Sequence, residues 1–154
     1  MEAAIQERIP HNHCWGCGSL NPMGLQIKSY WDGDETVCTW TPEPHFMAGP
    51  THVMNGGIIA TLLDCHSLCT AMAAAYRAEG RAMDSDPLIW YVTASMNIRY
   101  LRPTPIDAPV RLRARVNTVE GKKTRLTCTL SSGGNACATA EVLAVRVPGE
   151  WREE

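Results

Sequence analysis

The sequence lacks three features that would place it in a special class of protein. It contains no uninterrupted run of about 18 apolar residues, so no membrane-spanning helix and no membrane partner are expected. The N-terminus lacks the basic and then apolar pattern of a secretory signal. Excess positive charge is also missing, since 14 basic and 16 acidic side chains give a net charge of −2. This balance argues against a nucleic-acid partner gripped over a broad surface.

The sequence has the composition of an ordinary globular domain. Its 154 residues are enough for one domain with a core, and 45% of them are hydrophobic and 19% charged. No repeat, low-complexity tract or linker divides the chain, so we expect a single domain over 1–154 with an irregular segment over 1–22. Cysteine is present seven times, an odd number. With no export signal, reduced thiols in the cytoplasm fit better than a disulfide framework.

The residue pattern predicts two strands, one long helix and four more strands. A proline-free stretch rich in Ala, Leu and Met predicts a helix from Gly57 to Tyr76, with Asn55 as its N-cap and Gly80 as its stop. Short turns between the last four strands predict that these strands are antiparallel neighbours. Alternating apolar and polar residues indicate the strands themselves, over 24–31, 36–41, 90–101, 110–119, 124–130 and 136–147.

The predicted helix is apolar around its whole circumference. Such a helix must be enclosed by protein on most sides. We therefore expect an α+β architecture in which a curved antiparallel sheet of about six strands wraps one long central helix. The sheet would have exposed edges that a dimer could cover.

Two features of the predicted helix suggest chemistry. Asp64 is a carboxylate among apolar residues, where desolvation of an unpaired charge is costly and shifts its pKa. A purely structural role, in which Asp64 satisfies a loop backbone, is the alternative. Asn55-Gly56-Gly57 at the helix start offers dipole-aligned N–H groups that could stabilise a carbonyl oxygen as it becomes negative. The alternative there is a capping Asn followed by two loop glycines.

The spacing of these two features predicts an assembly of two chains. Asp64 follows Gly57 by seven residues, which is about 10 Å along a helix and a marginal reach for one carbonyl group. If two helices pack antiparallel, the Gly57 end of one chain meets Asp64 of the other. The sequence therefore predicts a dimer with composite sites. His66 points away from Asp64 on a helix and is expected to make a polar contact in the dimer seam.

Three segments resemble one known family. Residues 55–64 resemble the His-Gly-Gly…Asp signature of hotdog-fold acyl-CoA thioesterases of the PaaI-like and 4-hydroxybenzoyl-CoA thioesterase superfamily. Residues 14–25, which contain Cys-Trp-Gly-Cys-Gly and Asn-Pro-Met-Gly-Leu, and residues 95–103 resemble further segments of the same proteins. The resemblance implies a hotdog fold, hydrolysis of acyl-CoA thioesters, and a homodimer or a homotetramer. No cofactor is expected, because CoA is part of the substrate.

The resemblance also implies roles for individual residues. Asp64 would be the general base or nucleophile, the Gly57 backbone N–H would polarise the thioester carbonyl, and Thr93 would orient the attacking water. Asn55 stands where the family usually has His, and an amide can cap a helix but cannot titrate near neutral pH. Two alternatives stay open: a non-catalytic acyl-CoA-binding protein, and a hotdog dehydratase, which normally places a His beside its carboxylate.

The phosphates of CoA predict basic groups at the mouth of the site. The candidates, each of which could equally be a solvated surface residue, are Arg99, Arg102, Lys122, Lys123 and Arg125. Gly56 and Met54 complete the predicted substrate-binding set. The acyl group stays open between medium aliphatic and aromatic acids.

Four potential zinc ligands lie near the N-terminus: His11, His13, Cys14 and Cys17. Cys14-x-x-Cys17 has the spacing of a ligand pair, but structural zinc sites usually take two pairs from separate segments. No second close pair is expected, since the later cysteines fit small apolar core positions: Cys38, Cys69, Cys128 and Cys137. The sequence thus favours no metal and a turn that lines the dimer or acyl pocket.

Overall fold

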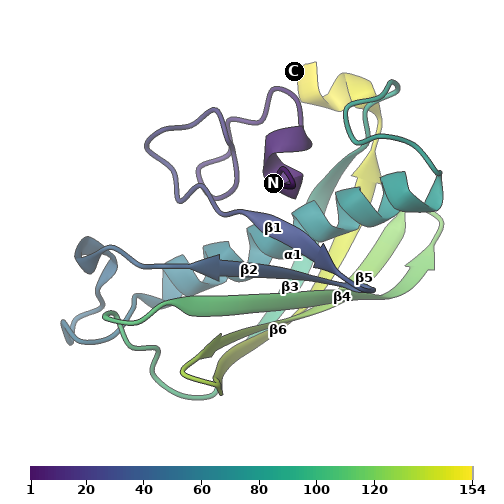
Figure 1. Ribbon diagram of the computed structural model, residues 1–154. Helices are drawn as coiled ribbons and strands as arrows, with labels where there is room; N and C mark the ends of the chain where they lie inside the picture. Colours follow the sequence, from purple (N-terminus) through teal and green to yellow (C-terminus); the bar gives the residue numbers. More distant parts are fainter. Residues whose placement is uncertain (154) are drawn as a thin grey trace.

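One long helix lies against an antiparallel sheet (Figure 1). A computed structural model describes residues 1–153. The helix is α1 (Gly56–Ala78), and the strands are β1 (Ser29–Asp32), β2 (Glu35–Trp40), β3 (Trp90–Tyr100), β4 (Val110–Glu120), β5 (Lys123–Ser132) and β6 (Asn135–Val147). Three short 3-10 helices lie outside the sheet: η1 (Ile5–Arg8), η2 (Pro44–Phe46) and η3 (Gly149–Glu153). The predicted α+β architecture is confirmed.

The sheet has the strand order β1-β2-β4-β5-β6-β3, so β1 and β3 are its edges. The β1 edge is only four residues long. Charged side chains lie at its end, where Arg113 of β4 forms ion pairs of 3.0 Å with Asp32 and 3.2 Å with Glu35. The β3 edge has 11 residues and pairs with β6 on one side. Its other side has no partner strand within residues 1–153.

Helix α1 begins and ends at the predicted local signals. Asn55 Oδ1 accepts hydrogen bonds from the N–H groups of Gly57 at 2.7 Å and Ile58 at 3.3 Å. At the other end Gly80 has a φ of +66°, a conformation that glycine adopts without steric cost. The predicted cap and stop are therefore confirmed, although the helix extends slightly past both predicted ends.

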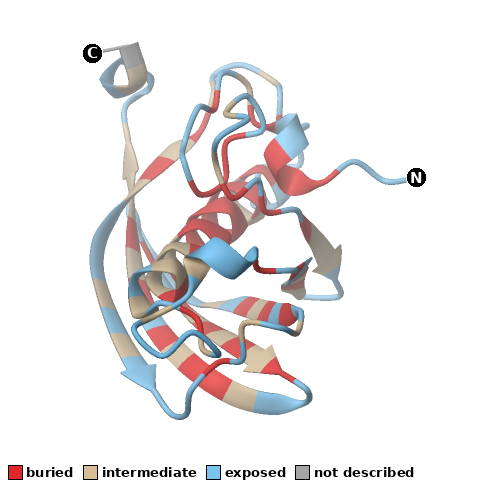
Figure 2. Cartoon of the chain, turned by 90° about the vertical axis from the view of Figure 1, so that its left-hand side faces the viewer, coloured by how far each residue is buried: buried red, intermediate tan, exposed pale blue. Residues whose placement is uncertain are grey.

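The middle of α1 is enclosed in the concave side of the sheet (Figure 2). Leu62, Leu63 and Cys69 are 0% exposed. Length and composition alone would let α1 cross a membrane, but 67% of its most apolar window is buried inside the fold. A core helix of this kind meets the same length and composition test, because it is apolar all round.

The predicted strand over 24–31 is confirmed only in its last part. Residues 24–28 do not join the sheet, because their backbone groups are used by the N-terminal loop. Leu25 N–H donates to Trp15 O at 2.8 Å. Gln26 has a φ of +50°, which interrupts the extended backbone. Alternation alone could not distinguish pairing with a loop from pairing with a strand.

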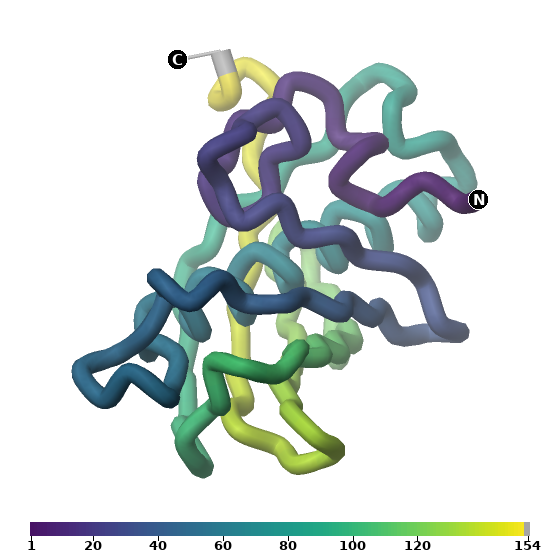
Figure 3. The backbone as a smooth tube through the Cα atoms, turned by 60° about the vertical axis from the view of Figure 1, so that its left-hand side comes forward, coloured from purple at the N-terminus to yellow at the C-terminus, as the bar shows by residue number. Residues whose placement is uncertain are grey.

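The expectation that β3 and β4 are antiparallel neighbours is wrong. β3 pairs with β6, and β4 pairs with β2 and β5. The connection over 101–109 carries the chain to the other part of the sheet and runs along the lower end of the molecule in Figure 3. It docks on the loop that precedes α1, where Met54 N–H donates to Thr104 O at 2.8 Å and Ile106 N–H donates to His52 O at 3.0 Å.

Candidate functional site

The Asp64 side chain meets β3 at the edge of the sheet. Thr93 Oγ1 donates a hydrogen bond of 2.6 Å to Asp64 Oδ1. Asp64 is half-buried and Thr93 is exposed. The register of β3 against β6 shifts between Thr93 and Ser95, so the strand is irregular beside the carboxylate. The structure thus brings together two residues of the predicted catalytic set, and it leaves them open to the surface of a single chain.

The surroundings of Asp64 change its acidity. Burial raises the pKa of the Asp64 carboxyl, and the hydrogen bond from Thr93 opposes this rise. A carboxylate with a raised pKa accepts a proton more readily near neutral pH. The arrangement can therefore serve as a general base or as an oxygen nucleophile.

The N-terminus of α1 is tied to the far end of the same strand. Tyr100 Oη donates to Gly56 O at 2.8 Å. A Cβ added at Gly56 would meet the Tyr100 ring at 3.6 Å, an ordinary contact, and neither Gly56 nor Gly57 has a positive φ. Packing within the chain therefore does not demand the glycine at position 56.

The Gly57 N–H is already in use in this structure, since it donates to Asn55 Oδ1 at 2.7 Å. It becomes available to a substrate carbonyl only when the Asn55 side chain turns away. Within one chain Asp64 follows Gly57 by seven residues, which amounts to about 10 Å along α1. The structure therefore does not bring the Gly57 amide and the Asp64 carboxylate together in a single subunit.

The predicted substrate-binding residues are dispersed. Met54 is 4% exposed and belongs to the core. Arg102 follows the end of β3 beside the start of α1, and is exposed. Lys122 lies in the β4–β5 turn, where its carbonyl accepts from Arg146 N–H at 2.8 Å, and Lys123 is the first residue of β5. Gly121 of this turn shares a hollow with Ala78, at the opposite end of α1 from Gly57.

Two further predicted basic residues lie on the outer face of the sheet. Arg125 is exposed between the buried residues Thr124 and Leu126, which places it on the face away from α1. Arg99 lines a surface hollow with Thr127 and other outer-face residues. The structure therefore does not gather the basic residues at one mouth within a single chain.

His66 is a core residue, and the expectation that it lies in a dimer seam is wrong. Its ring is 0% exposed in a single chain. Nδ1 lies 2.8 Å from Ser29 Oγ and Nε2 lies 3.1 Å from Thr36 Oγ1, so the ring joins α1 to β1 and β2. Burial lowers the pKa of His66 to about 4. The ring is enclosed and both its nitrogens have partners on β1 and β2, so it does not take part in the site around Asp64.

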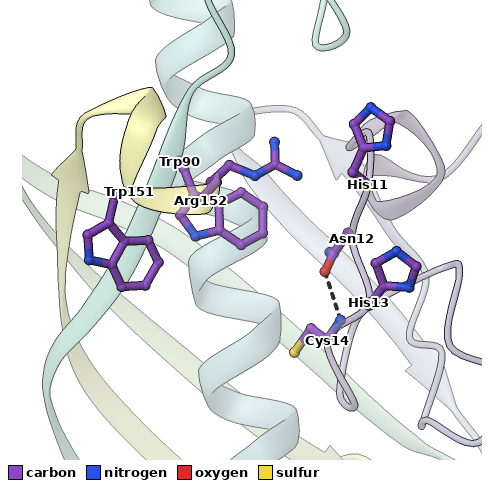
Figure 4. Close-up of a pocket in the computed structure, with 7 residues that line it drawn as sticks. All are labelled: His11, Asn12, His13, Cys14, Trp90, Trp151 and Arg152. Carbon is purple, nitrogen blue, oxygen red and sulfur yellow. Dashed lines mark hydrogen bonds between the residues drawn. The ribbon is translucent and has the colours of Figure 1, made fainter. Parts of the chain in front are cut away.

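An open hollow of about 500 Å³ lies between the N-terminal loop and the start of β3 (Figure 4). His11, His13 and Cys14 line one side, and Trp90 and Arg152 line the other (Figure 4). The Arg152 guanidinium stacks 4.5 Å from the centre of the Trp90 ring. The N-terminal loop therefore lines a cavity three residues along β3 from Thr93.

Cysteines from the loop and the helix converge beside this hollow, which the sequence argument missed. The sulfurs of Cys14, Cys17 and Cys65 all lie within 4.8 Å of one another. The structure thus adds one later cysteine, Cys65, to the Cys14 and Cys17 pair, while Cys69 is a core residue as predicted. Cys65 and Cys69 are four residues apart in the predicted helix and therefore share one face, but this spacing does not show that the face meets Cys14 and Cys17.

Comparison with known proteins gives a consistent family. Residues 51–139 match the model of the thioesterase superfamily. An acyl-coenzyme A thioesterase THEM4 from Rattus norvegicus is 32% identical over 112 residues, which cover 71% of this chain and 42% of the relative. The chain thus spans less than half the length of the curated relatives it matches.

Solved structures show the same fold. A thioesterase superfamily protein from Shewanella loihica has a TM-score of 0.68 and 33% identity, with coverage of 90% of this chain and 96% of that one. The E. coli PaaI protein of the phenylacetic acid degradation operon has a TM-score of 0.66 and 16% identity, with coverage of 81% and 82%. The second likeness concerns the fold alone.

Proposed function

The chain belongs to the thioesterase superfamily, and on this premise we propose that it hydrolyses acyl-CoA thioesters to a free acid and CoA. The observation that carries the proposal is the half-buried Asp64 carboxylate, which accepts a hydrogen bond of 2.6 Å from Thr93 on an edge strand. The curated relatives it matches are named acyl-coenzyme A thioesterases, which supports the same substrate class.

Asp64 would act on the thioester carbonyl in one of two ways. As a general base it takes a proton from water while the water oxygen attacks the carbonyl carbon. As a nucleophile it attacks the carbon itself and forms an anhydride that water then opens. In both cases the carbon–sulfur bond breaks and CoA leaves as a thiolate. Thr93 holds one carboxylate oxygen, so the other oxygen is directed to the reaction.

The start of α1 would stabilise the carbonyl oxygen as it becomes negative. Gly57 N–H is the proposed donor, and the helix dipole at this end favours negative charge. The substrate oxygen would have to replace Asn55 Oδ1, which now accepts from this N–H. Asn55 also carries an amide NH₂ group that can donate to the same oxygen after the side chain turns.

The site would be completed by a second copy of the chain. The Gly57 amide and Asp64 are too far apart in one subunit for one carbonyl, and Thr93 is exposed on the unpaired β3 edge. Two copies that meet at β3 would cover this edge and could place the helix start of one beside Asp64 of the other. We therefore propose a homodimer, which could pair further into a tetramer, with shared sites.

The test is release of free CoA thiol from a series of acyl-CoA substrates by the wild-type protein and by Asp64→Asn. Asn has nearly the same shape as Asp but is neither a base nor a nucleophile here, so kcat should fall by about 100-fold or more. Ser95→Ala, on the same strand, is a matched control that should keep wild-type kcat. Full activity in Asp64→Asn would refute the mechanism.

A second candidate function is acyl-CoA binding without turnover. It is favoured by the Asn55 side chain, which occupies the Gly57 N–H that an enzyme would offer to the carbonyl. A binding protein would show saturable association with acyl-CoA in calorimetry but no steady release of thiol. An enzyme would show both.

A further inference from the structure

Three thiols meet where the N-terminal loop crosses α1, and a fourth lies one helical turn further along the helix. Cys14 Sγ lies 3.8 Å from Cys65 Sγ, and Cys17 Sγ lies within 4.8 Å of both. Cys69, one helical turn after Cys65 on the same face of α1, is 0% exposed and lies outside this group of three. Two of these residues come from the loop and two from the helix, which is the arrangement of two ligand pairs from separate segments that structural zinc sites use.

The spacing of the sulfurs fits a common metal ion. Two thiolates bound to tetrahedral zinc at about 2.3 Å each are about 3.8 Å apart, and Cys14 and Cys65 have a separation of 3.8 Å. This separation is far longer than the roughly 2.05 Å of a disulfide, and all seven cysteines are free. Two unbound sulfurs in van der Waals contact have a similar separation. We therefore infer the metal site from the convergence of further thiols on this pair.

The loop is built to lie close to Cys65. A Cβ at Gly16 would overlap the side chains of Cys65 and Thr61, so glycine lets the backbone approach the helix here. Cys14 N–H donates to Asn12 Oδ1 at 3.0 Å, and Gly18 N–H donates to Cys14 O at 2.8 Å. These bonds fold residues 12–18 into a tight turn that presents both loop cysteines to the helix.

The surroundings also hold the Cys17 sulfur in place. Asn12 Nδ2 donates a hydrogen bond of 3.5 Å to Cys17 Sγ inside the fold, and outer contacts of this kind orient metal-ligating side chains. Soft thiolate ligands select zinc over harder divalent ions such as magnesium.

We propose that Cys14, Cys17 and Cys65 bind one zinc ion, with Cys69 as the fourth sulfur, and that this ion clamps the N-terminal loop onto α1. Cys14 is exposed and lines the 500 Å³ hollow, which gives the ion a path to the site. Cys65 directly follows Asp64 in α1. The clamp therefore fixes the helix next to the proposed base without supplying a reacting group.

The test is titration of the full chain, stripped of metal and kept reduced under argon, with Co²⁺ and then Zn²⁺. About one Co²⁺ per chain should bind and give the thiolate-to-metal charge-transfer band and the intense visible bands of a tetrahedral thiolate site, and Zn²⁺ should displace it. Zinc should also raise the Tm, because it binds the folded chain. None of these readouts depends on thiol release from acyl-CoA.

Single variants identify the ligands. Cys14→Ser and Cys65→Ser should each weaken zinc binding by at least about 100-fold and abolish the zinc-dependent rise in Tm. Cys14 is exposed, so its variant should fold. Cys137→Ala, a buried cysteine of β6 outside the group, should bind zinc like the wild type. The proposal is overturned if reduced protein gives no thiolate–cobalt bands, if binding survives Cys65→Ser, or if the thiols form a disulfide under argon.

Discussion

The hydrogen bond from Thr93 Oγ1 to Asp64 Oδ1 crosses from β3 to α1 and holds the carboxylate in one orientation. Thr93→Val removes the donor but keeps the side-chain shape. A hydrogen bond to a charged group contributes about 1.5–3 kcal/mol, so kcat should fall by about 10- to 100-fold with little change in KM. Steady-state kinetics on one acyl-CoA would measure both constants. Thr93→Ser should recover most of kcat, and a Val variant with wild-type kcat would contradict the role.

His66 is a residue whose importance concerns stability. Its ring is hydrogen-bonded to Ser29 and Thr36 inside the core. His66→Leu should lower the free energy of unfolding by about 1–3 kcal/mol, because the buried hydroxyls of Ser29 and Thr36 each lose a hydrogen-bond partner. Urea denaturation measures the change. His52→Leu, at an exposed loop position, should change stability by less than about 0.5 kcal/mol, and equal effects of the two variants would contradict the prediction.

Among the elements, the first turn of α1 combines a cap with a proposed oxyanion site. Asn55→Asp separates these functions. Asp caps a helix as well as Asn, and its charge favours the helix dipole, so Tm should stay the same or rise slightly. The same charge would repel a carbonyl oxygen that becomes negative, so kcat should fall by about tenfold or more. Asn55→Ser, a neutral cap, should lose less of kcat, and an Asp variant that keeps wild-type kcat would exclude this oxyanion site.

The elements also show what the sequence could and could not predict. Helix α1 was predictable because its signals are local: Asn55 caps it and Gly80 ends it. The position of β3 beside β6 was not, because it depends on how the 101–109 connection docks on a distant loop. The meeting of Cys14 and Cys65 joins residues 51 positions apart, and no local pattern encodes such a contact.

For the candidate site, the resemblance to the thioesterase family predicted which residues take part, and the fold shows where these residues lie. Asp64 and Thr93 are 29 positions apart and the structure brings them into contact. The basic residues could not be placed in advance, because their position depends on strand faces and on the length of α1. Lys122 and Gly57 lie at opposite ends of that helix. Their roles, like the roles of Asp64 and Gly57, stay predictions.

At the scale of the whole molecule, shared sites predict complementation between two inactive chains. A Gly57→Val chain would disturb the proposed oxyanion site, and an Asp64→Ala chain would lack the base. When the two are unfolded together and refolded, mixed dimers should regain part of the wild-type kcat, since each contains one intact composite site. Thiol release measures the gain over each variant refolded alone. No gain in confirmed mixed dimers would exclude sites shared across the interface.

The two sheet edges differ in a way that would limit the addition of further strands to the proposed dimer. Charged residues and a length of four residues make the β1 edge a poor template for another strand, whereas the β3 edge is long. Symmetric pairing of two copies through β3 uses up both long edges at once. The proposed dimer would then expose only a short charged strand at each end, so it would be closed to further strand addition and would resist polymerisation into fibres.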